Sequence, residues 1–284
     1  MAFPIPRLDH VVVDARDRME EAARVYHSLG FHLTERSRHT LGSENHLAVF
    51  ETDYVELLGF DPAGGKIRPD ILAWPVGLNG LVFSLDQPEE FYGDLHSRGV
   101  PADEPQAFSR PVNLGAGLSH DAQFRVVRLR AGTASFGRVY FCHHLTPELI
   151  WRPEWRRHPN GAASVARVTI AARDPGASAG LLSRIFGPQA VRPGSPGSDV
   201  SWTLAAGSVA VDFLMPGILS HRLGDAAPDP AGRADYMAAL AIRTASLAAA
   251  ARALQAGGVA ARIEPHRILV PAAAAMNVAI EFVE

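Results

Sequence analysis

Residues 8–31, LDHVVVDARDRMEEAARVYHSLGF, contain the unit that decides the fold. The unit opens with a mostly apolar run, LDHVVV, which predicts a buried strand. Asp17 then stands where a helix N-cap belongs, and Glu20 follows three residues later as a capping-box partner. Helical spacing relates the apolar residues of the next segment, Met19, Ala22, Ala23 and Tyr26. Gly30 is typical of a helix end, so the unit predicts a strand, a helix and a second strand from Phe31.

The same order of strand, helix and terminating glycine returns three times along the chain. It recurs in GLVFSLDQPEEFYGDLHSRGV (80–100), ARVTIAARDPGASAGLLSRIFGP (166–188) and LAIRTASLAAAARALQAGGV (240–259). The expected caps of these helices are Asp86, Asp174, and Thr244 or Ser246. The four glycines that end the helices, at positions 30, 99, 187 and 257, are separated by 69, 88 and 70 residues. Two similar spacings around a longer one indicate two pairs of units.

Each unit also closes with a strand-like run: DYVELLGF (53–60), RVYFCHHL (138–145), SVAVDFLMP (208–216) and NVAIEFVE (277–284). The sequence therefore predicts an α+β fold of four βαβββ modules in two paired-module domains, residues 1–152 and 162–284, with WRPEWRRHPNGA (151–162) as the linker between them. In each pair we expect a curved sheet around a cavity, with the helices packed outside. Strand–helix–strand order with capped helices is also common in other α/β and α+β proteins, which is the alternative interpretation.

Bulk composition narrows the class of protein. The 284 residues are 47% hydrophobic and 20% charged with a net charge of -3, which is ordinary globular composition without a basic stripe for nucleic acid. Cys142 is the only cysteine, so no internal disulfide can form, and a lone cysteine in an apolar strand is usually an inert packed residue. We see neither a secretory signal nor an apolar run long enough for a membrane. We expect a cytoplasmic protein with a small-molecule partner, no membrane partner, and homodimerisation as an open option.

The paired βαβββ order, with LDHVVV opening the first module and YVELLGF closing it, resembles the vicinal oxygen chelate superfamily. That superfamily includes glyoxalase I, extradiol dioxygenases and bleomycin-resistance proteins. The stretch CHHLTPELIW (142–151) is similar, more narrowly, to glyoxalase-like domain proteins. The resemblance implies metal ligands on the first and last strands of two paired modules, pointing into a shared cavity.

Carried over to this chain, the resemblance places His10 at the first-strand position and Glu56 at the last-strand position of module one. The first strand of module two has Gly80, which cannot ligate and departs from the four-ligand glyoxalase I pattern. Its last strand offers His143 and His144, and alternation along the strand favours His144 for the cavity face. The expected metal ligands are thus His10, Glu56 and His144, for one divalent ion of Fe, Mn, Ni, Co or Zn. Each of the three also has a purely structural interpretation.

Five further residues could act around this site. Tyr54 and Tyr140 share faces with the expected ligands, so they either bind substrate or pack. Glu148 is a candidate general base, or a carboxylate at a helix start. Arg110 or Arg128 could hold a substrate carboxylate through a bidentate pair.

These residues favour a metal-dependent enzyme of lyase, isomerase or dioxygenase type. Its small carbonyl or enol substrate would chelate the ion through neighbouring oxygens. The alternative is a metal-free binding protein of the bleomycin-resistance type, and a weaker one is an interaction scaffold. The second pair of modules has Val168 and Ile242 where His10 would stand and no histidine on its closing strands, so we interpret it as degenerate.

Overall fold

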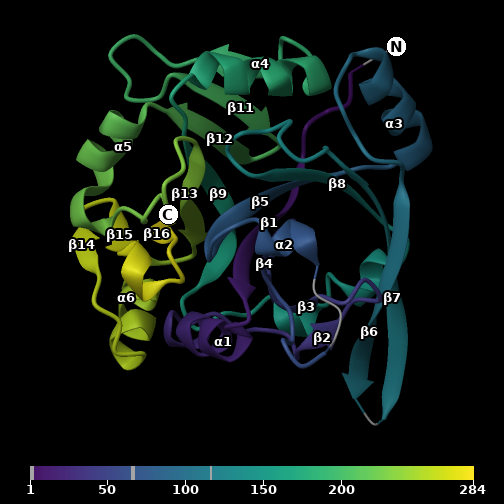
Figure 1. The fold of residues 1–284 in the computed structure, drawn as a ribbon. Helices are drawn as coiled ribbons and strands as arrows, with labels where there is room; N and C mark the ends of the chain where they lie inside the picture. Colours follow the sequence, from purple (N-terminus) through teal and green to yellow (C-terminus); the bar gives the residue numbers. More distant parts are fainter. Residues whose placement is uncertain (1–2, 65–67, 116) are drawn as a thin grey trace.

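A computed structural model describes residues 3–64, 68–115 and 117–284, and it contains four βαβββ modules, as predicted (Figure 1). Module one consists of β1 (Leu8–Arg16), α1 (Met19–Ser28), β2 (Ser37–Arg38), β3 (Glu44–Val49) and β4 (Tyr54–Gly59). Module two consists of β5 (Gly77–Ser84), α3 (Pro88–Ser97), β6 (Gln106–Gly115), β7 (Leu118–Arg128) and β8 (Arg138–His144). The short helix α2 (Pro69–Leu72) connects these two modules.

The second half repeats this order. Module three consists of β9 (Ala162–Ala171), α4 (Pro175–Phe186), β10 (Val191–Pro193), β11 (Trp202–Ala206) and β12 (Val209–Leu214). Module four consists of β13 (Tyr236–Thr244), α6 (Leu247–Ala256), β14 (Arg262–Glu264), β15 (Arg267–Val270) and β16 (Ala279–Val283). Helix α5 (Pro216–Leu223) connects them, and the 3-10 helices are Pro147–Leu149, Pro153–Trp155, Gly224–Ala226 and Ala272–Ala274.

The strands form two eight-stranded sheets of equivalent topology. The first has the order β2-β3-β4-β1-β5-β8-β7-β6, and the second has the order β10-β11-β12-β9-β13-β16-β15-β14. In the first sheet β1 runs parallel to β4 and antiparallel to β5, and β5 runs parallel to β8. The first and last strands of both modules therefore lie side by side at the centre of the sheet, which brings their side chains to one concave face. The domain boundaries 1–152 and 162–284 stay a prediction.

Side-chain capping explains the starts of α4 and α6 but not those of α1 and α3. Asp174 caps α4 by accepting a hydrogen bond from the Ala177 N–H at 2.9 Å, and Ser246 caps α6, so these two predictions are confirmed. The prediction of Asp17 as a cap is wrong, because β1 continues to Arg16 and the turn into α1 places Arg18 at the N-cap. Asp86 does not cap α3 either, since Gln87 occupies its N-cap position without a side-chain bond.

One large core joins the two halves. The helix-facing sides of both sheets contribute to a single cluster of buried side chains, among them Val11, Leu81, Val168 and Leu240. In Figure 1, α1 and α6 lie together at the bottom and α3 and α4 at the top. At the α1–α6 contact, a Cβ added to Gly257 would lie 1.9 Å from the Ser28 carbonyl oxygen, so the two backbones meet without side chains between them. None of the described helices is long and apolar enough to cross a membrane.

The concave faces of the two sheets differ. The first has a separate cluster around a polar pocket, with Val12, Leu47, Tyr54, Leu58, Val82 and Cys142 among its members. On the second, Leu219 and Leu223 of α5 pack against Ala171 and Ala239. Beside them the buried carboxylate of Glu281 is within 4 Å of three arginines, Arg167, Arg222 and Arg267. Apolar packing and ion pairs thus occupy the concave face of the second half.

Candidate functional site

His10 and Glu56 face each other on the concave side of the first sheet. His10 is on β1 and Glu56 on the neighbouring β4, where Glu56 is the register partner of Val12. The Nε2 atom of His10 lies 3.7 Å from Oε2 of Glu56, and both side chains are buried. Two ligands that each lie about 2.1 Å from one ion, at roughly 90–120°, are about 3.0–3.6 Å apart. The pair therefore fits a shared divalent ion with little movement.

Asp9 orients the His10 ring. Its Oδ1 atom lies 2.5 Å from His10 Nδ1, so Nδ1–H donates to the carboxylate and Nε2 is left to face Glu56. A carboxylate on the second nitrogen of a histidine is the usual support of a metal-ligating imidazole. Burial alone would raise the pKa of Asp9, but the two histidines His144 and His10 outweigh it and hold the pKa well below its ordinary value. Asp9 is therefore an ionised hydrogen-bond acceptor.

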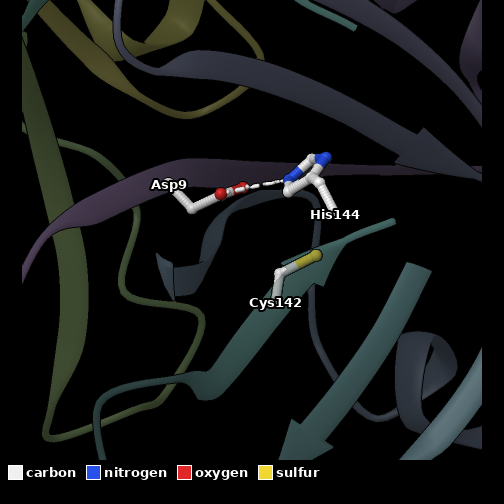
Figure 2. Close-up of side chains that lie close together, drawn as sticks. All are labelled: Asp9, Cys142 and His144. Atoms are coloured by element: carbon white, nitrogen blue, oxygen red, sulfur yellow. Dashed lines mark hydrogen bonds and ion pairs between the residues drawn. The ribbon is translucent and has the colours of Figure 1, made fainter. Parts of the chain in front are cut away.

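His144 approaches this pair only through Asp9. Figure 2 shows the His144 ring directed at the Asp9 carboxylate. The Nε2 atom lies 3.1 Å from that carboxylate, while Nδ1 is buried without a hydrogen-bond partner in the described part of the chain. The Tyr54 ring stacks on His10 at 4.3 Å between centroids and meets the His144 ring edge-on at 6.4 Å. The structure thus brings His10 and Glu56 together directly and connects His144 to them by a bridging carboxylate.

Asp9, Cys142 and His144 are the one group of three potential metal ligands in the described residues whose ligand atoms all lie within 4.8 Å of one another (Figure 2). It shares only His144 with the set expected from the sequence. Burial, with the nearby carboxylates of Asp9 and Glu56, raises the pKa of the Cys142 thiol well above its ordinary value. Because Asp9 already accepts hydrogen bonds from both histidines, this group serves better as support for His10 than as a separate metal site.

Two residues that the sequence analysis did not identify, Asn45 and His39, lie next to the Glu56 carboxylate. Asn45 donates a hydrogen bond to Glu56 Oε1 at 2.7 Å, and His39 Nε2 lies 3.8 Å from the same oxygen. Burial lowers the pKa of His39 to about 4, and the guanidinium groups of Arg110, Arg68 and Arg128 add to the effect against the opposing charge of Glu56. Asn45 and Leu47 on β3 face Leu58 and Glu56 on β4, so matching these two strands was the signal that could have found Asn45.

A pocket of about 50 Å³ adjoins the His10–Glu56 pair. All four predicted substrate-binding residues line it, namely Tyr54, Tyr140, Arg110 and Arg128. Burial alone would raise the pKa of Glu56. The charges of His10, His39 and Arg110 and the hydrogen bond from Asn45 outweigh this effect, so the pKa of the carboxyl group is below its ordinary value and the group is ionised. The predicted catalytic residue Glu148 lies elsewhere, exposed on the 3-10 helix Pro147–Leu149, and it does not line this pocket.

The fold has known relatives. Among solved structures, the chain resembles a hypothetical protein from Staphylococcus aureus, with a TM-score of 0.65 and 11% identity over 98% of this chain and 99% of that one. It also resembles a mutant of 4-hydroxymandelate synthase from Streptomyces coelicolor, with a TM-score of 0.57 and 12% identity over 99% and 92% of the two chains. A third is a fusion protein of a xylose isomerase-like TIM barrel and 4-hydroxyphenylpyruvate dioxygenase, with a TM-score of 0.58 and 12% identity. All of this chain aligns with 50% of the fusion protein.

Sequence comparison identifies the family. No curated protein matches the chain significantly. The family model of the glyoxalase-like domain, however, matches residues 8–186, which is more than half of the chain. This match confirms the resemblance to the vicinal oxygen chelate superfamily, and the chain belongs to the glyoxalase-like domain family.

Proposed function

We propose that this protein is a metal-dependent enzyme acting on a small carbonyl or enol compound, with His10 and Glu56 as its protein ligands. The observation that carries the proposal is the 3.7 Å separation between His10 Nε2 and Glu56 Oε2 beside a pocket. The donor set of imidazole and carboxylate suits Fe, Mn, Ni, Co or Zn. When bound, such an ion would polarise a substrate oxygen.

The chain's own residues would hold this site in place. Asp9 fixes the tautomer of His10 through Nδ1, and Tyr54 stacks on the same ring and fixes its plane. Asn45 holds one oxygen of Glu56 and leaves Oε2 directed at His10. We assign His144 to this supporting group, because its Nε2 is engaged by Asp9.

The reaction type is the finer part of the proposal. Two proteins of similar fold are titled a 4-hydroxymandelate synthase and a 4-hydroxyphenylpyruvate dioxygenase fusion. Oxygen-dependent chemistry is therefore the first type to assay, ahead of lyase and isomerase activity. The assays should use small compounds with two neighbouring oxygens.

Metal content of purified protein tests the proposal. Wild type, reconstituted in turn with each of the five metals and desalted, should retain about one ion per chain of at least one of them. His10→Ala and Glu56→Gln should retain almost none. Asp9→Asn should bind the ion roughly 10–100-fold more weakly, because it loses the carboxylate that orients His10.

His143→Ala is the matched control. His143 is adjacent to His144, but its Nδ1 lies 2.8 Å from the Leu85 carbonyl oxygen, away from the pocket, so its removal should leave the metal content unchanged. A His144→Ala variant as metal-free as His10→Ala would make His144 a ligand rather than a support. If wild type retains none of the five metals, the enzyme proposal fails and the metal-free binding protein takes its place.

A further inference from the structure

Arg110 is a buried cation whose guanidinium has an unused donor. Its side chain lies on β6, only 2% of the residue is exposed, and its Nη2 has no hydrogen-bond partner among the residues that the structure describes. It forms no hydrogen bond or ion pair with any residue that the structure describes. Burial lowers the pKa of this guanidinium below its ordinary value, although Tyr54 and Glu56 oppose the effect. Buried charges in proteins are normally paired, so a guanidinium of this kind beside a pocket indicates a binding site for an anion.

Other donors on the same pocket wall also lack partners. Arg128 on β7 bonds Gln106 through Nη1 at 2.7 Å, but its Nε is buried without a partner in the described residues. The Tyr140 hydroxyl on β8 is likewise buried without a hydrogen-bond partner in the described residues. The Arg128 guanidinium lies 5.6 Å from the centre of the Tyr140 ring. Three side chains of one pocket, from three neighbouring strands, thus carry unused hydrogen-bond donors.

The remaining arginines near this site have carboxylate partners. Arg68 bonds Asp70 through Nε at 3.0 Å and Ser43 through Nη1 at 3.2 Å. Arg138 forms a buried ion pair with Asp14. The one carboxylate in the pocket wall, Glu56, is directed toward His10 and held by Asn45. Within the described part of the chain, no carboxylate therefore lies within ion-pair distance of Arg110 or Arg128, although the charge of Glu56 partly offsets that of Arg110.

We propose that the pocket binds the carboxylate of a small organic acid, with Arg110 and Arg128 as its binding residues and Tyr140 as a third donor. Planar guanidinium groups match the two oxygens of a carboxylate. The proposal rests on the proposed function in one respect, namely that the same compound supplies the carbonyl or enol oxygen next to His10 and Glu56. The volume of about 50 Å³ admits the centres of roughly three to five water molecules, which restricts the ligand to a compact acid.

Arg110 also borders a second, larger pocket. That outer pocket has a volume of about 520 Å³ and is lined by residues 32–38, 110–113, 119 and 155. Arg128 does not line it, so loss of binding in variants of both arginines would place the acid in the inner pocket.

Binding of pyruvate to EDTA-treated protein, measured by calorimetry, tests the proposal without any metal. Pyruvate should bind, and uncharged pyruvamide should bind at least about tenfold more weakly, because hydrogen bonds to a charged group are stronger than those to a neutral one. Arg110→Gln and Arg128→Gln should each weaken pyruvate binding about 10–100-fold, and Arg110→Lys by less. Arg130→Gln is the control for net charge, since Arg130 is exposed and outside both pockets, and it should bind within about twofold of wild type.

A second measurement separates binding from folding. Arg110→Met removes an unpaired buried cation, so its melting temperature without ligand should be at or above that of wild type, while the rise caused by pyruvate should disappear. A melting temperature far below wild type would show that Arg110 is structural and would overturn the proposal. Equal binding of pyruvate and pyruvamide, or tighter binding of inorganic phosphate than of pyruvate, would overturn the carboxylate assignment.

The two proposals can fail independently. If the EDTA-treated protein binds pyruvate through Arg110 but wild type retains no metal, the acid pocket stands and the metal-dependent enzyme does not. If wild type retains metal through His10 and Glu56 but binds pyruvate no better than Arg110→Gln does, the metal site stands and the acid pocket does not.

Discussion

The chemistry of each buried histidine depends on what its two ring nitrogens contact. In His10, Nδ1 is hydrogen-bonded to Asp9 and Nε2 faces the pocket. In His144, Nε2 is hydrogen-bonded to Asp9 instead. His158 in the linker is different, because Nδ1 accepts from the His32 backbone N–H at 3.0 Å and Nε2–H donates to the Val49 carbonyl at 2.9 Å. Only the neutral ring can make both of these bonds. Burial accordingly lowers the pKa of His158 to about 4, against the opposing bond to Val49.

We predict that His158 makes the protein sensitive to mild acid. Its pKa is about 4 in the folded state and 6.5 ordinarily, so the unfolded state binds the proton more readily. Its contribution to stability is complete above pH 6.5 and is lost as the pH falls toward 4, at a cost of up to about 3 kcal/mol. Denaturant unfolding of wild type at pH values between about 7.5 and 4.5 should show this loss, and His158→Gln should show less of it.

The exposed His266 supplies the control for this experiment. His266→Gln should lose stability with falling pH as steeply as wild type does. An equally steep loss in His158→Gln would mean that other groups bind the proton.

Alternation along the strands predicted some site residues and missed others. It found Tyr140 on the pocket face, because β8 pairs with β5 without interruption at that position, whereas Glu56 was placed by the family resemblance. It missed Asp9, because the register between β1 and β5 shifts between Leu8 and His10, and side-chain direction no longer follows simple parity there. His39 lies in the turn between β2 and β3, which no periodic pattern in the sequence locates.

Among the strands, β5 shows why glycine stands where the four-ligand glyoxalase I pattern has a ligand. A Cβ added to Gly80 would lie 2.6 Å from Val12 Cβ and 2.7 Å from Val12 Cγ2 on the neighbouring β1. Gly80 is thus a packing requirement of the β1–β5 pair. A histidine at this position could not be accommodated without displacing Val12.

We therefore predict that Gly80→Ala lowers the free energy of unfolding by about 1–3 kcal/mol through overpacking. Val12→Gly in the same chain removes both Cβ and Cγ2 and should restore part of this loss, so that the double variant is more stable than the sum of the single effects predicts. Denaturant unfolding of the four proteins gives this coupling. Additive losses would show that Val12 is not the residue that excludes a side chain at Gly80.

The order of the elements was readable because local signals agree with the fold. Terminating glycines end α1 and α3, where Gly30 and Gly99 have φ angles of 83° and 65°, and polar caps start α4 and α6. The connecting helices α2 and α5 were not predicted. Both are short and begin at a proline without a side-chain cap, and α5 is held by the packing of Leu219 and Leu223 on the second sheet, which depends on tertiary structure.

The two halves share one architecture but differ in how the charged residues on their concave faces are paired. The second sheet balances its charges, since Glu281 is 2% exposed and lies 2.7 Å from Arg267, 3.5 Å from Arg222 and 3.6 Å from Arg167. In the first, Arg110 lies beside a pocket without an ion-pair partner among the described residues. This contrast supports the interpretation of the second half as a stabilising partner of the first.

We therefore predict that Glu281→Ala lowers the stability of the fold without changing binding at the candidate site. Removing this buried carboxylate takes an ion-pair partner from half-buried Arg222, while Arg167 keeps Asp212 and Arg267 keeps Glu264, so the free energy of unfolding should fall by about 1–3 kcal/mol. Metal content and pyruvate affinity per folded molecule should stay unchanged. Glu264→Ala is the control, because Glu264 pairs with Arg267 near the surface and should contribute about 1 kcal/mol or less. Loss of bound metal in Glu281→Ala would instead give the second half a direct role in the site.

The long hairpin of β6 and β7 at the right of Figure 1 carries Arg110 and Arg128, together with the pocket residues Phe108, Phe124 and Val126. His10 and Glu56 are on β1 and β4 instead. In the two proposals, the residues that select the compound and those that act on it are thus encoded in separate stretches of the gene. Under these proposals, natural recombination, or a deliberate exchange of this one hairpin between family members, would change the acid that is bound without altering the strands that carry His10 and Glu56.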